Sequence, residues 1–363
     1  MSLQTVLRAD LRDFAGYRSA RSEAAVGDCF LDANEAAGNS LADASGALRR
    51  YPDPQPPALR EALARLYGCT PAALLATRGS DEAIDLLVRA ACPPGAGAVV
   101  VAPPVFGMYA VCARLHGARV VEVPLRDDGR EFGADLDAMG TAALDAAASL
   151  VFLCAPGNPA GGVPDASAVV GLARRLDGHA LVAMDEAYIE FADAPSLLRA
   201  VAGRPGSAAW PTNLVVLRTL SKAHALAGAR IGAVAGDPVL VAALQRCQAP
   251  YPLSRPAVER ALAALAPAAL AATVARIDAT RVTRSRLAAA LARCPGVRRV
   301  HPAQANFLLV RFDDAGAALR RLRTAGIVVR DMRAHAALQD ALRITIGDDA
   351  QAATVLRALG EAA

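Results

Sequence analysis

From about residue 57 onward, segments with helical periodicity alternate with short runs of β-branched residues. The helical segments are Ala58–Leu66, Glu82–Ala91, Ala166–Leu176 and Val239–Arg246. The short runs are Ala98–Val101, Arg119–Val123, Leu150–Leu153, Leu181–Met184, Leu214–Leu217 and Ile231–Val234. Because parallel strands need long crossover connections, this alternation predicts an α/β fold with a mostly parallel sheet that helices cover on both faces.

The pattern changes at two places, which divide the chain into three parts. Residues 1–50 are polar and irregular, which is typical of an arm rather than of a domain. After the Pro-rich segment Ala249–Pro252, a long Ala/Leu/Arg helical region is expected at about 256–293. Beyond it we expect strands at Phe307–Val310, Ile327–Val329 and Arg343–Ile346, and helices near 315–325 and at the end. We therefore predict an N-terminal arm (1–50), a large domain (51–250) and a smaller α+β domain (251–363).

Composition narrows the possible functions. The net charge is +4 and the arginines are dispersed among acidic residues, so no basic tract predicts a nucleic-acid interface. The seven cysteines are far apart, which argues against structural zinc and a disulfide framework and favours reduced thiols. No signal-peptide core is visible, and the longest apolar stretch, Ala261–Ala275, is too short to span a bilayer. We therefore expect a cytoplasmic enzyme without a metal site or a membrane partner.

Lys222 is the only lysine among the 39 lysine and arginine residues of the chain. An arginine cannot replace an amine that must lose its proton and attack a carbonyl, because its guanidinium group stays charged. A lysine kept in so arginine-rich a chain is therefore a candidate for covalent amine chemistry. The alternative is a stray surface lysine, but the flanking segment, Arg218 to Arg230, favours the catalytic interpretation.

Polar motifs follow two successive expected strands, at the strand ends where parallel α/β sheets bind ligands. Asp185 comes directly after Leu181–Met184, and a carboxylate at the end of a buried strand needs a cation such as a protonated pyridine nitrogen. Asn158 follows Leu150–Leu153 in a proline-restricted turn, and its amide could donate to a phenolate oxygen. Each motif also has a simpler interpretation, a loop-capping aspartate and an ordinary Asx-turn.

A phosphate site is indicated at two further places. The Gly79-Ser80-Asp81 step opens an apolar helix, and the free backbone N–H groups of a helix N-terminus bind phosphate. Plain helix capping would explain this motif equally well. Beside the lysine, Thr219, Ser221 and Arg230 could hold the same dianion, which leaves the amine facing an aldehyde carbon.

Two more residues complete the pattern. Phe106, in a chain with few aromatic residues, could stack on a flat ring, although a core phenylalanine is the alternative. Arg343 lies among β-branched residues, where a cation needs an anion, and Arg330 is expected nearby; a structural salt bridge is the alternative. Together the motifs specify a cofactor with a cationic ring nitrogen, a phenolate oxygen, an aldehyde and a phosphate, which is pyridoxal 5′-phosphate.

The sequence resembles the fold-type I pyridoxal-phosphate aminotransferases over essentially its whole length. Asp185-Glu186-Ala187-Tyr188 and Thr219-Leu220-Ser221-Lys222 match motifs of this superfamily. Asn34-Glu35, Arg50-Tyr51-Pro52 and Phe106-Gly107-Met108-Tyr109 are similar to its histidinol-phosphate aminotransferase branch. The resemblance implies a large domain with a mostly parallel sheet, a smaller α+β domain, and a homodimer with the site at the interface.

The resemblance also implies a role for each matching residue. Lys222 would bond covalently to the cofactor aldehyde, Asp185 would pair with the ring nitrogen, and Phe106 would stack on the ring. Asn158 and Tyr188 would contact the ring oxygen. The cofactor phosphate would be held by the backbone groups of Ser80 and Asp81, by Ser221 and Arg230, and by Tyr51 of the other subunit. The substrates would be bound by Arg343, which takes the glutamate carboxylate, by Arg330 and Tyr17, which hold the substrate phosphate, and by Asn34.

The implied reaction is a ping-pong transamination in histidine biosynthesis. It interconverts histidinol phosphate and 2-oxoglutarate with imidazole acetol phosphate and glutamate. Lys222 would act as general base and acid while Asp185 keeps the ring nitrogen protonated. One arginine site that accepts a carboxylate or a phosphate would let both substrates share the pocket.

The sequence departs from the family pattern at four places. Ala160 stands where threonine is usual, Phe106 where tyrosine is common, Ala36-Ala37 where a proline is usual, and His224 where an aromatic residue is frequent. None of these changes removes a catalytic group. Alternatives within the fold are an aromatic or broad-specificity aminotransferase and a decarboxylase of an amino-acid phosphate. A non-catalytic ligand-binding module is disfavoured by Lys222 and by the lack of a helix-turn-helix pattern in residues 1–50.

Overall fold

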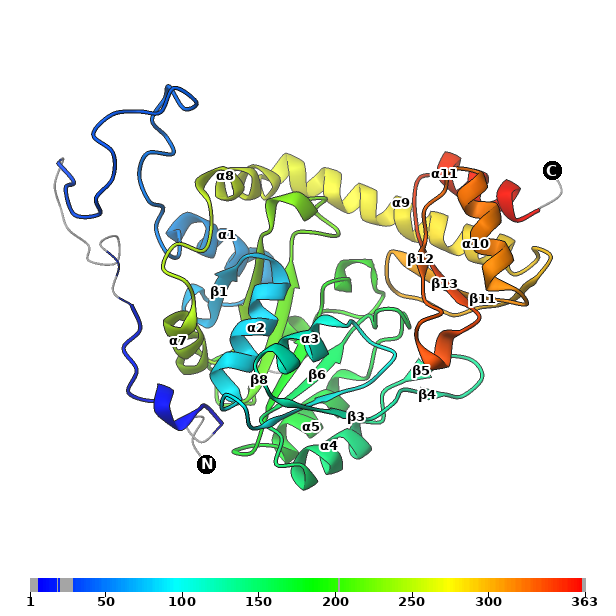
Figure 1. The fold of residues 1–363 in the computed structure, drawn as a ribbon, viewed down its shortest axis with the longest axis horizontal. Coiled ribbons are helices and arrows are strands. Elements are labelled where there is room, and N and C mark those ends of the chain that lie inside the picture. The colour runs from blue at the N-terminus through cyan, green and yellow to red at the C-terminus, as the bar shows by residue number, and fades with distance from the viewer. Residues whose placement is uncertain (1–5, 18, 20–28, 202, 361–363) are drawn as a thin grey trace.

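The computed structural model describes residues 6–17, 19, 29–201 and 203–360. A seven-stranded sheet forms its centre, in the order β1-β9-β8-β7-β6-β2-β3 (Figure 1). The strands are β1 (Leu74–Thr77), β2 (Ala98–Val101), β3 (Arg119–Glu122), β6 (Leu150–Cys154), β7 (Leu181–Asp185), β8 (Leu214–Thr219) and β9 (Gly232–Ala235). The neighbouring strands β3, β2, β6, β7 and β8 are parallel, and β9 runs antiparallel to both of its neighbours, β8 and β1. The predicted α/β fold with a mostly parallel sheet is confirmed.

Helices cover both faces of this sheet because its strands are apolar on both sides. One face packs under α1 (Pro57–Tyr67), α4 (Leu136–Asp145), α5 (Ala166–Arg175), α6 (Leu197–Ala200) and α8 (Arg255–Ala264). The other packs under α2 (Gly79–Ala91), α3 (Met108–Leu115) and α7 (Pro238–Cys247). Alternate strand residues supply the two cores; Val100 points to the first layer and Val99 to the second.

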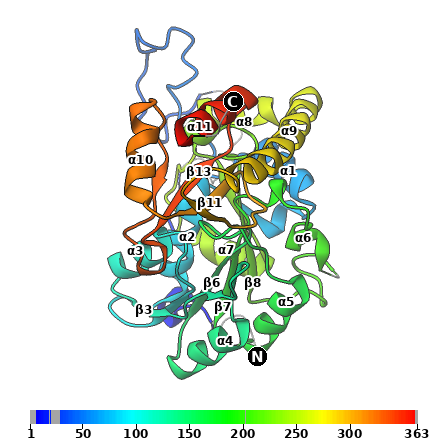
Figure 2. The same cartoon turned by 90° about the vertical axis from the view of Figure 1, so that its right-hand side faces the viewer.

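A second sheet of four antiparallel strands forms the centre of the C-terminal region, in the order β10-β11-β13-β12. Its strands are β10 (Val297–Val300), β11 (Phe307–Phe312), β12 (Arg330–Asp331) and β13 (Ala341–Thr345). One face packs on α9 (Pro267–Leu291), α10 (Ala315–Thr324) and α11 (Asp349–Leu359), as the view onto this region shows (Figure 2). Its other face is turned toward the large sheet.

The helical region expected at 256–293 resolves into α8 and α9, which bend by 72° at their junction. Pro267 stands at the first turn of α9, where its missing N–H costs no hydrogen bond and its ring prevents continuation from α8. Within the described part of the chain, no single helix is long and apolar enough to cross a membrane, although this bent pair passes that test by length and composition. Leu253, Val258 and Ala261 pack in the core of the large sheet, and the domain boundary placed at residue 251 stays a prediction.

The strand expected at Ile327–Val329 is wrong, since the edge strand is Arg330–Asp331. The Ile327 amide donates to the Leu322 carbonyl at the end of α10, directly after Gly326 with its φ of +74°. Because Ile327 takes part in the end of the helix, residues 327–329 do not pair in the sheet, and the Val328 side chain is 92% exposed. Sequence analysis did not predict strand β1, because its four residues are all buried and show no alternation of apolar and polar side chains.

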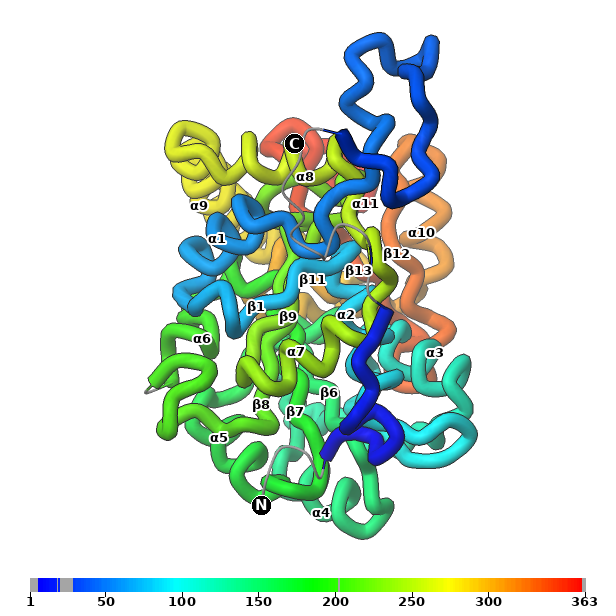
Figure 3. Tube along the Cα trace, turned by 90° about the vertical axis from the view of Figure 1, so that its left-hand side faces the viewer, coloured from blue at the N-terminus to red at the C-terminus, as the bar shows by residue number. Residues whose placement is uncertain are grey.

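The described part of the arm lies outside both sheets. Its first residues run along α2, where Arg8 donates through its backbone amide to Ala90 and through its side chain to Arg89. The later residues project from the body beside α8, as the blue trace shows (Figures 1 and 3). Arm residues with exposed apolar side chains are Phe14, Tyr17, Leu31, Leu41 and Leu48, and Tyr51 directly after the arm is exposed as well.

Candidate active site

The carboxyl ends of β6, β7 and β8 lie side by side and bring the predicted motifs together. In the strand register Cys154 pairs with Asp185, and Asp185 pairs with Leu217, five residues before Lys222. A cavity of about 120 Å³ opens at this edge. It is lined by nine of the ten predicted cofactor-binding residues, namely Ser80, Asp81, Phe106, Asn158, Asp185, Tyr188, Ser221, Lys222 and Arg230, and by Cys154, Ala187, Thr219 and Ala227. Tyr51 alone of the ten does not line it.

Asp185 forms the floor of this cavity. Its side chain is buried and accepts hydrogen bonds from the Tyr109 hydroxyl at 2.8 Å and from the Ala187 backbone amide at 3.1 Å. Burial raises the pKa of Asp185 to about 6, which the Tyr109 hydrogen bond partly opposes. A buried carboxylate with so raised a pKa fits a cationic ring nitrogen, whose charge would stabilise the ionised form.

Tyr109 is a residue of the site to which sequence analysis gave no role. It lies on α3, fully buried, with its ring stacked on Phe152 at 4.6 Å and edge-on to Phe106 at 5.7 Å. These contacts fix the direction of its hydroxyl, which points at Asp185. No local signal would have found it, because Phe106 precedes α3 and the partner of Tyr109, Asp185, lies 76 residues further along the chain.

Asn158 connects the cofactor cavity to the small domain. Its amide nitrogen donates to the Tyr188 hydroxyl at 3.4 Å, and its amide oxygen accepts from Nη1 of Arg343. Burial raises the pKa of Tyr188, so its hydroxyl keeps its proton and remains a donor. Asn158 therefore stands between the cavity and an arginine that comes from the other sheet.

Lys222 reaches the cavity from the segment after β8. Its Nζ lies 5.6 Å from the centre of the Tyr188 ring. Partial burial lowers its pKa, and the guanidinium groups of Arg343 and Arg230 lower it further, although Asp81 opposes them. A lowered pKa leaves more of the amine neutral near pH 7, which is the nucleophilic form.

The opposite end of the cavity has the features of a phosphate cradle. Arg230 pairs with Asp81 at 2.8 Å, and the Thr219 hydroxyl donates to the Ser221 hydroxyl at 2.9 Å. The N-terminus of the 13-residue helix α2 points its free amides at the same place. A Cβ on Gly232 would come within 2.5 Å of the backbone of Gly79, so glycine is needed for the close approach of β9 to this helix start.

Arg343 and Arg330 face each other across β13 and β12 as a register pair, as expected from the sequence. Burial lowers the pKa of Arg343, and its guanidinium lies 5.2 Å from the centre of the Phe307 ring. Neither arginine forms an ion pair with a carboxylate of the described residues. The predicted alternative of a structural salt bridge is therefore not what these residues display. Neither arginine lines the cofactor cavity, Arg330 is exposed, and their binding of a substrate anion stays a prediction.

Tyr17, Asn34 and Tyr51 do not line the cavity within one chain. Tyr17 is 72% exposed, and Asn34 is exposed with a positive φ of 54°. Tyr51 is 48% exposed and stacks on Tyr251 at a ring distance of 4.3 Å. Their roles toward substrate and cofactor stay predictions, and they require a second surface.

The family model for aminotransferase class I and II matches residues 23–359. The chain belongs to this aminotransferase family. It is 55% identical to the histidinol-phosphate aminotransferase of Xylella fastidiosa (strain 9a5c) over 98% of this chain and 95% of that one. It is 56% identical to the histidinol-phosphate aminotransferase of Xanthomonas campestris pv. campestris (strain 8004) over 99% and 97% of the two chains.

Among solved structures, the histidinol-phosphate aminotransferase of Sinorhizobium meliloti in complex with pyridoxal 5′-phosphate is similar. The identity is 31%, the TM-score is 0.74, and the match covers 90% of this chain and 88% of that one. These matches confirm the predicted aminotransferase fold and the prediction of an enzyme. In this aminotransferase, the described residues contain no group of three or more His, Cys, Asp or Glu side chains that could hold a metal ion.

Proposed function

We propose that this aminotransferase binds pyridoxal 5′-phosphate and interconverts histidinol phosphate and 2-oxoglutarate with imidazole acetol phosphate and glutamate. The observation that carries the proposal is one cavity lined by Lys222, Asp185 and Arg230, in a chain 55% identical to a histidinol-phosphate aminotransferase. An amine, a buried carboxylate and a phosphate cradle match the three ends of this cofactor. When bound, the cofactor supplies an aldehyde for amine exchange and a ring that accepts electron density.

The proton transfers are assigned to Lys222. With its lowered pKa, the amine takes the proton from the substrate Cα and later returns one, as general base and then general acid. Asp185 would hold a proton-bearing ring nitrogen, and Tyr109 keeps the carboxylate oriented. Asn158 and Tyr188 would orient the ring oxygen, Phe106 would cover the ring, and the backbone groups of Ser80 and Asp81, with Ser221 and Arg230, would hold the phosphate end; all of them line the cavity.

Substrate anions are assigned to the small domain. Arg343 receives a carboxylate of glutamate or the phosphate of histidinol phosphate, because a guanidinium pairs bidentately with either group. Arg330, its register partner, adds a second positive charge on the same side. Tyr51 would reach the cofactor phosphate from the second subunit of a homodimer, and Tyr17 and Asn34 of the arm would add substrate contacts, since none of the three lines the cavity within one chain. We expect the dimer to act in the cytoplasm.

A half-reaction titration tests the proposal. Histidinol phosphate, phenylalanine and threonine phosphate are added separately to the enzyme loaded with pyridoxal 5′-phosphate, without an oxo acid. Histidinol phosphate should discharge the visible absorbance stoichiometrically, at concentrations well below those at which phenylalanine acts. Equal efficiency with phenylalanine would favour a broad-specificity aminotransferase, and release of carbon dioxide from threonine phosphate would favour a decarboxylase.

A further inference from the structure

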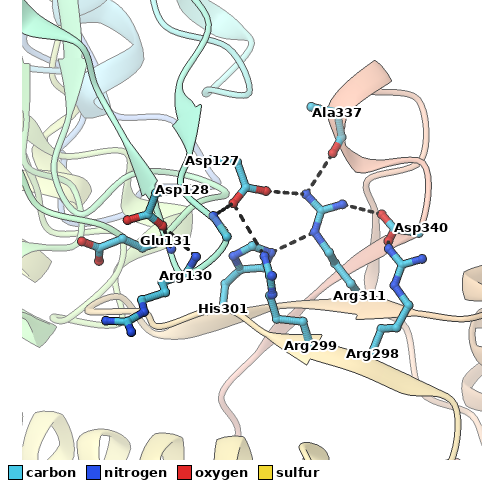
Figure 4. A network of polar contacts seen from close by, with 11 residues as sticks. Asp127, Asp128, Arg130, Glu131, Arg298, Arg299, His301, Arg311, Ala337 and Asp340 are labelled. Atoms are coloured by element: carbon cyan, nitrogen blue, oxygen red, sulfur yellow. Dashed lines mark hydrogen bonds and ion pairs between the residues drawn. The ribbon is translucent and has the colours of Figure 1, made fainter.

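Besides the active site, a polar network connects the large domain to the small sheet (Figure 4). On the large-domain side it comes from the hairpin of β4 (Arg126–Asp127) and β5 (Phe132–Gly133). Asp127 of this hairpin faces two cations of the small sheet, Arg311 at 3.4 Å and Arg299 at 3.6 Å. Asp127 is the acidic residue of the hairpin that crosses to the small domain.

Arg311 is held firmly from its own side. Its Nη1 donates to Asp340 at 2.7 Å, its Nη2 to the Ala337 carbonyl at 3.1 Å, and its Nε to Nε2 of His301 at 3.0 Å. Burial and the neighbouring arginines lower the pKa of His301 to about 4, so this imidazole stays neutral and accepts. Because these three hydrogen bonds hold the Arg311 guanidinium in position, Asp127 pairs with a cation that is already oriented.

An apolar cluster lies beside this pair and reaches the cofactor site. Phe132 of the hairpin stacks on His301 at 5.1 Å and packs with Leu309 and Ala341 of the small sheet. The same cluster contains Ala160, two residues beyond Asn158. The hairpin, the Asn158 turn and the small sheet therefore meet at one contact.

The strand register relates this contact to the substrate arginine. On β11, Leu308 and Val310 pack on the helices of the small domain, whereas Leu309 and Arg311 point to the large domain. Leu309 pairs with Arg343, and Arg311 pairs with Ala341, two residues along β13. Arg311 and Arg343 thus project from one face of one sheet, the first toward Asp127 and the second toward Asn158.

We propose that the Asp127–Arg311 pair is a positioning device for Arg343. By fixing the small sheet to the hairpin, the pair keeps the Arg343 guanidinium at the distance from the cofactor cavity at which it receives a substrate anion. This inference rests on the proposed function only in giving Arg343 a substrate anion. Asp127 and Arg311 do not line the cofactor cavity, so their loss changes the concentration at which substrate saturates rather than the chemical step.

The test compares Asp127→Asn with Asp128→Asn in the full chain loaded with pyridoxal 5′-phosphate. Both remove one charge from the same hairpin, but Asp128 accepts only from the backbone amides of Arg130 and Glu131, a role that an asparagine oxygen keeps. In the half-reaction with glutamate, D127N should raise the half-saturating concentration roughly fivefold, the effect of an ion pair worth about 1 kcal/mol. Its rate at saturation should stay within about twofold, and D128N should match the wild type.

Hydrogen–deuterium exchange gives a second readout without turnover. In protein with or without cofactor, D127N should speed exchange in residues 126–133 and 297–312, and D128N should not. Asp127→Glu, which keeps the charge, should restore both readouts. Equal behaviour of D127N and D128N, or a loss of saturating rate at unchanged half-saturation, would overturn the proposal. If wild type ignores histidinol phosphate while these differences persist with glutamate, the proposed substrate fails and the positioning role stands.

Discussion

The cofactor cavity and the N-terminal arm differ in how far one chain holds them in place. In the cavity, Asp185 is 3% exposed, and its neighbours are fixed by strand register and by hydrogen bonds. In the arm, Leu31 is 89% exposed and Leu41 is fully exposed at 104%. Neither of these leucines has an apolar partner in the cores of the described residues.

This contrast separates the groups that would carry out the reaction, which one chain supplies, from the arm, which would complete the site. The groups that would handle protons come from strand ends of one chain and need no partner. The arm carries Tyr17 and Asn34, which are predicted to contact substrate, and also apolar side chains that water contacts in the single chain; such surface marks an interface. Changes in the cavity should therefore affect turnover at any protein concentration, and changes in the arm should act through dimer formation.

The largest effect is expected for Lys222→Arg. The variant keeps the positive charge and removes the amine that can lose its proton, so it separates covalent chemistry from electrostatics. We expect a loss of turnover of about 10³-fold or more and loss of the visible absorbance of bound cofactor. Absorbance spectra and steady-state rates check this, with circular dichroism to confirm the fold. Retention of both properties would show that the cavity is not the reaction centre.

Asp185→Asn should act in opposite directions on activity and on stability. Turnover should fall about 10²-fold, because a neutral amide cannot keep a ring nitrogen protonated. The pKa of Asp185 in the fold, about 6, lies above its ordinary value of 3.8, so the native state holds its proton longer than the unfolded chain. Stability without cofactor therefore falls as pH rises from about 4 to 6.

The Asp185→Asn variant has an uncharged amide at this position, so it does not lose stability through ionisation of a buried carboxyl group. At pH 7 the variant without cofactor should be more stable than wild type by about 2 kcal/mol, and at pH 4 the two should be equal. Chemical denaturation at the two pH values measures the difference. An equal free energy of unfolding at pH 7 would mean that the buried carboxylate costs nothing, which would contradict its raised pKa.

The arm side of the comparison is tested by Leu31→Glu combined with Leu41→Glu. Charges on these two exposed positions should weaken dimerisation about tenfold or more while leaving the free energy of unfolding of the single chain unchanged. Sedimentation at decreasing concentration measures the dimer, and turnover should fall in parallel. Val328→Glu is the matched control, since Val328 is 92% exposed but belongs to the small domain. Loss of turnover without dissociation of the dimer would contradict the prediction that the arm acts through dimer formation.

Sequence analysis predicted the residues that line the cavity better than the residues that hold them in place. Asp185 and Asn158 were found because each follows an apolar strand, and strand ends of a parallel sheet meet at one edge. Lys222 was found because it is the only lysine of the chain. Tyr109 was missed because its bond to Asp185 joins residues 76 apart, a relation that no local pattern encodes. The shifted edge strand has a similar cause: the ending of α10, not β propensity, decides where residues 327–331 can pair.

The smallest effect is expected for Tyr109→Phe, which is the most specific test of the cavity because it removes a single hydroxyl group. The ring and its stacking on Phe152 remain, and only the donor to Asp185 is lost. Because this hydrogen bond lowers the pKa of Asp185, its removal should raise that pKa and shift the acid limb of the kcat/KM profile to higher pH by about half a unit to one unit, an energy of about 1 kcal/mol. At pH 8 activity should stay within about threefold of wild type.

Tyr67→Phe is the control for this last change. The Tyr67 hydroxyl is also buried, but it has no hydrogen-bond partner among the described residues and lies away from Asp185, on α1. Its removal should leave the acid limb unmoved and the free energy of unfolding equal or slightly higher, since an unpaired buried hydroxyl costs stability. If both variants shifted the limb equally, the shift would report general packing. If only Tyr109→Phe shifts it, a single hydroxyl on α3 sets the proton affinity of the carboxylate on which the cofactor ring would depend.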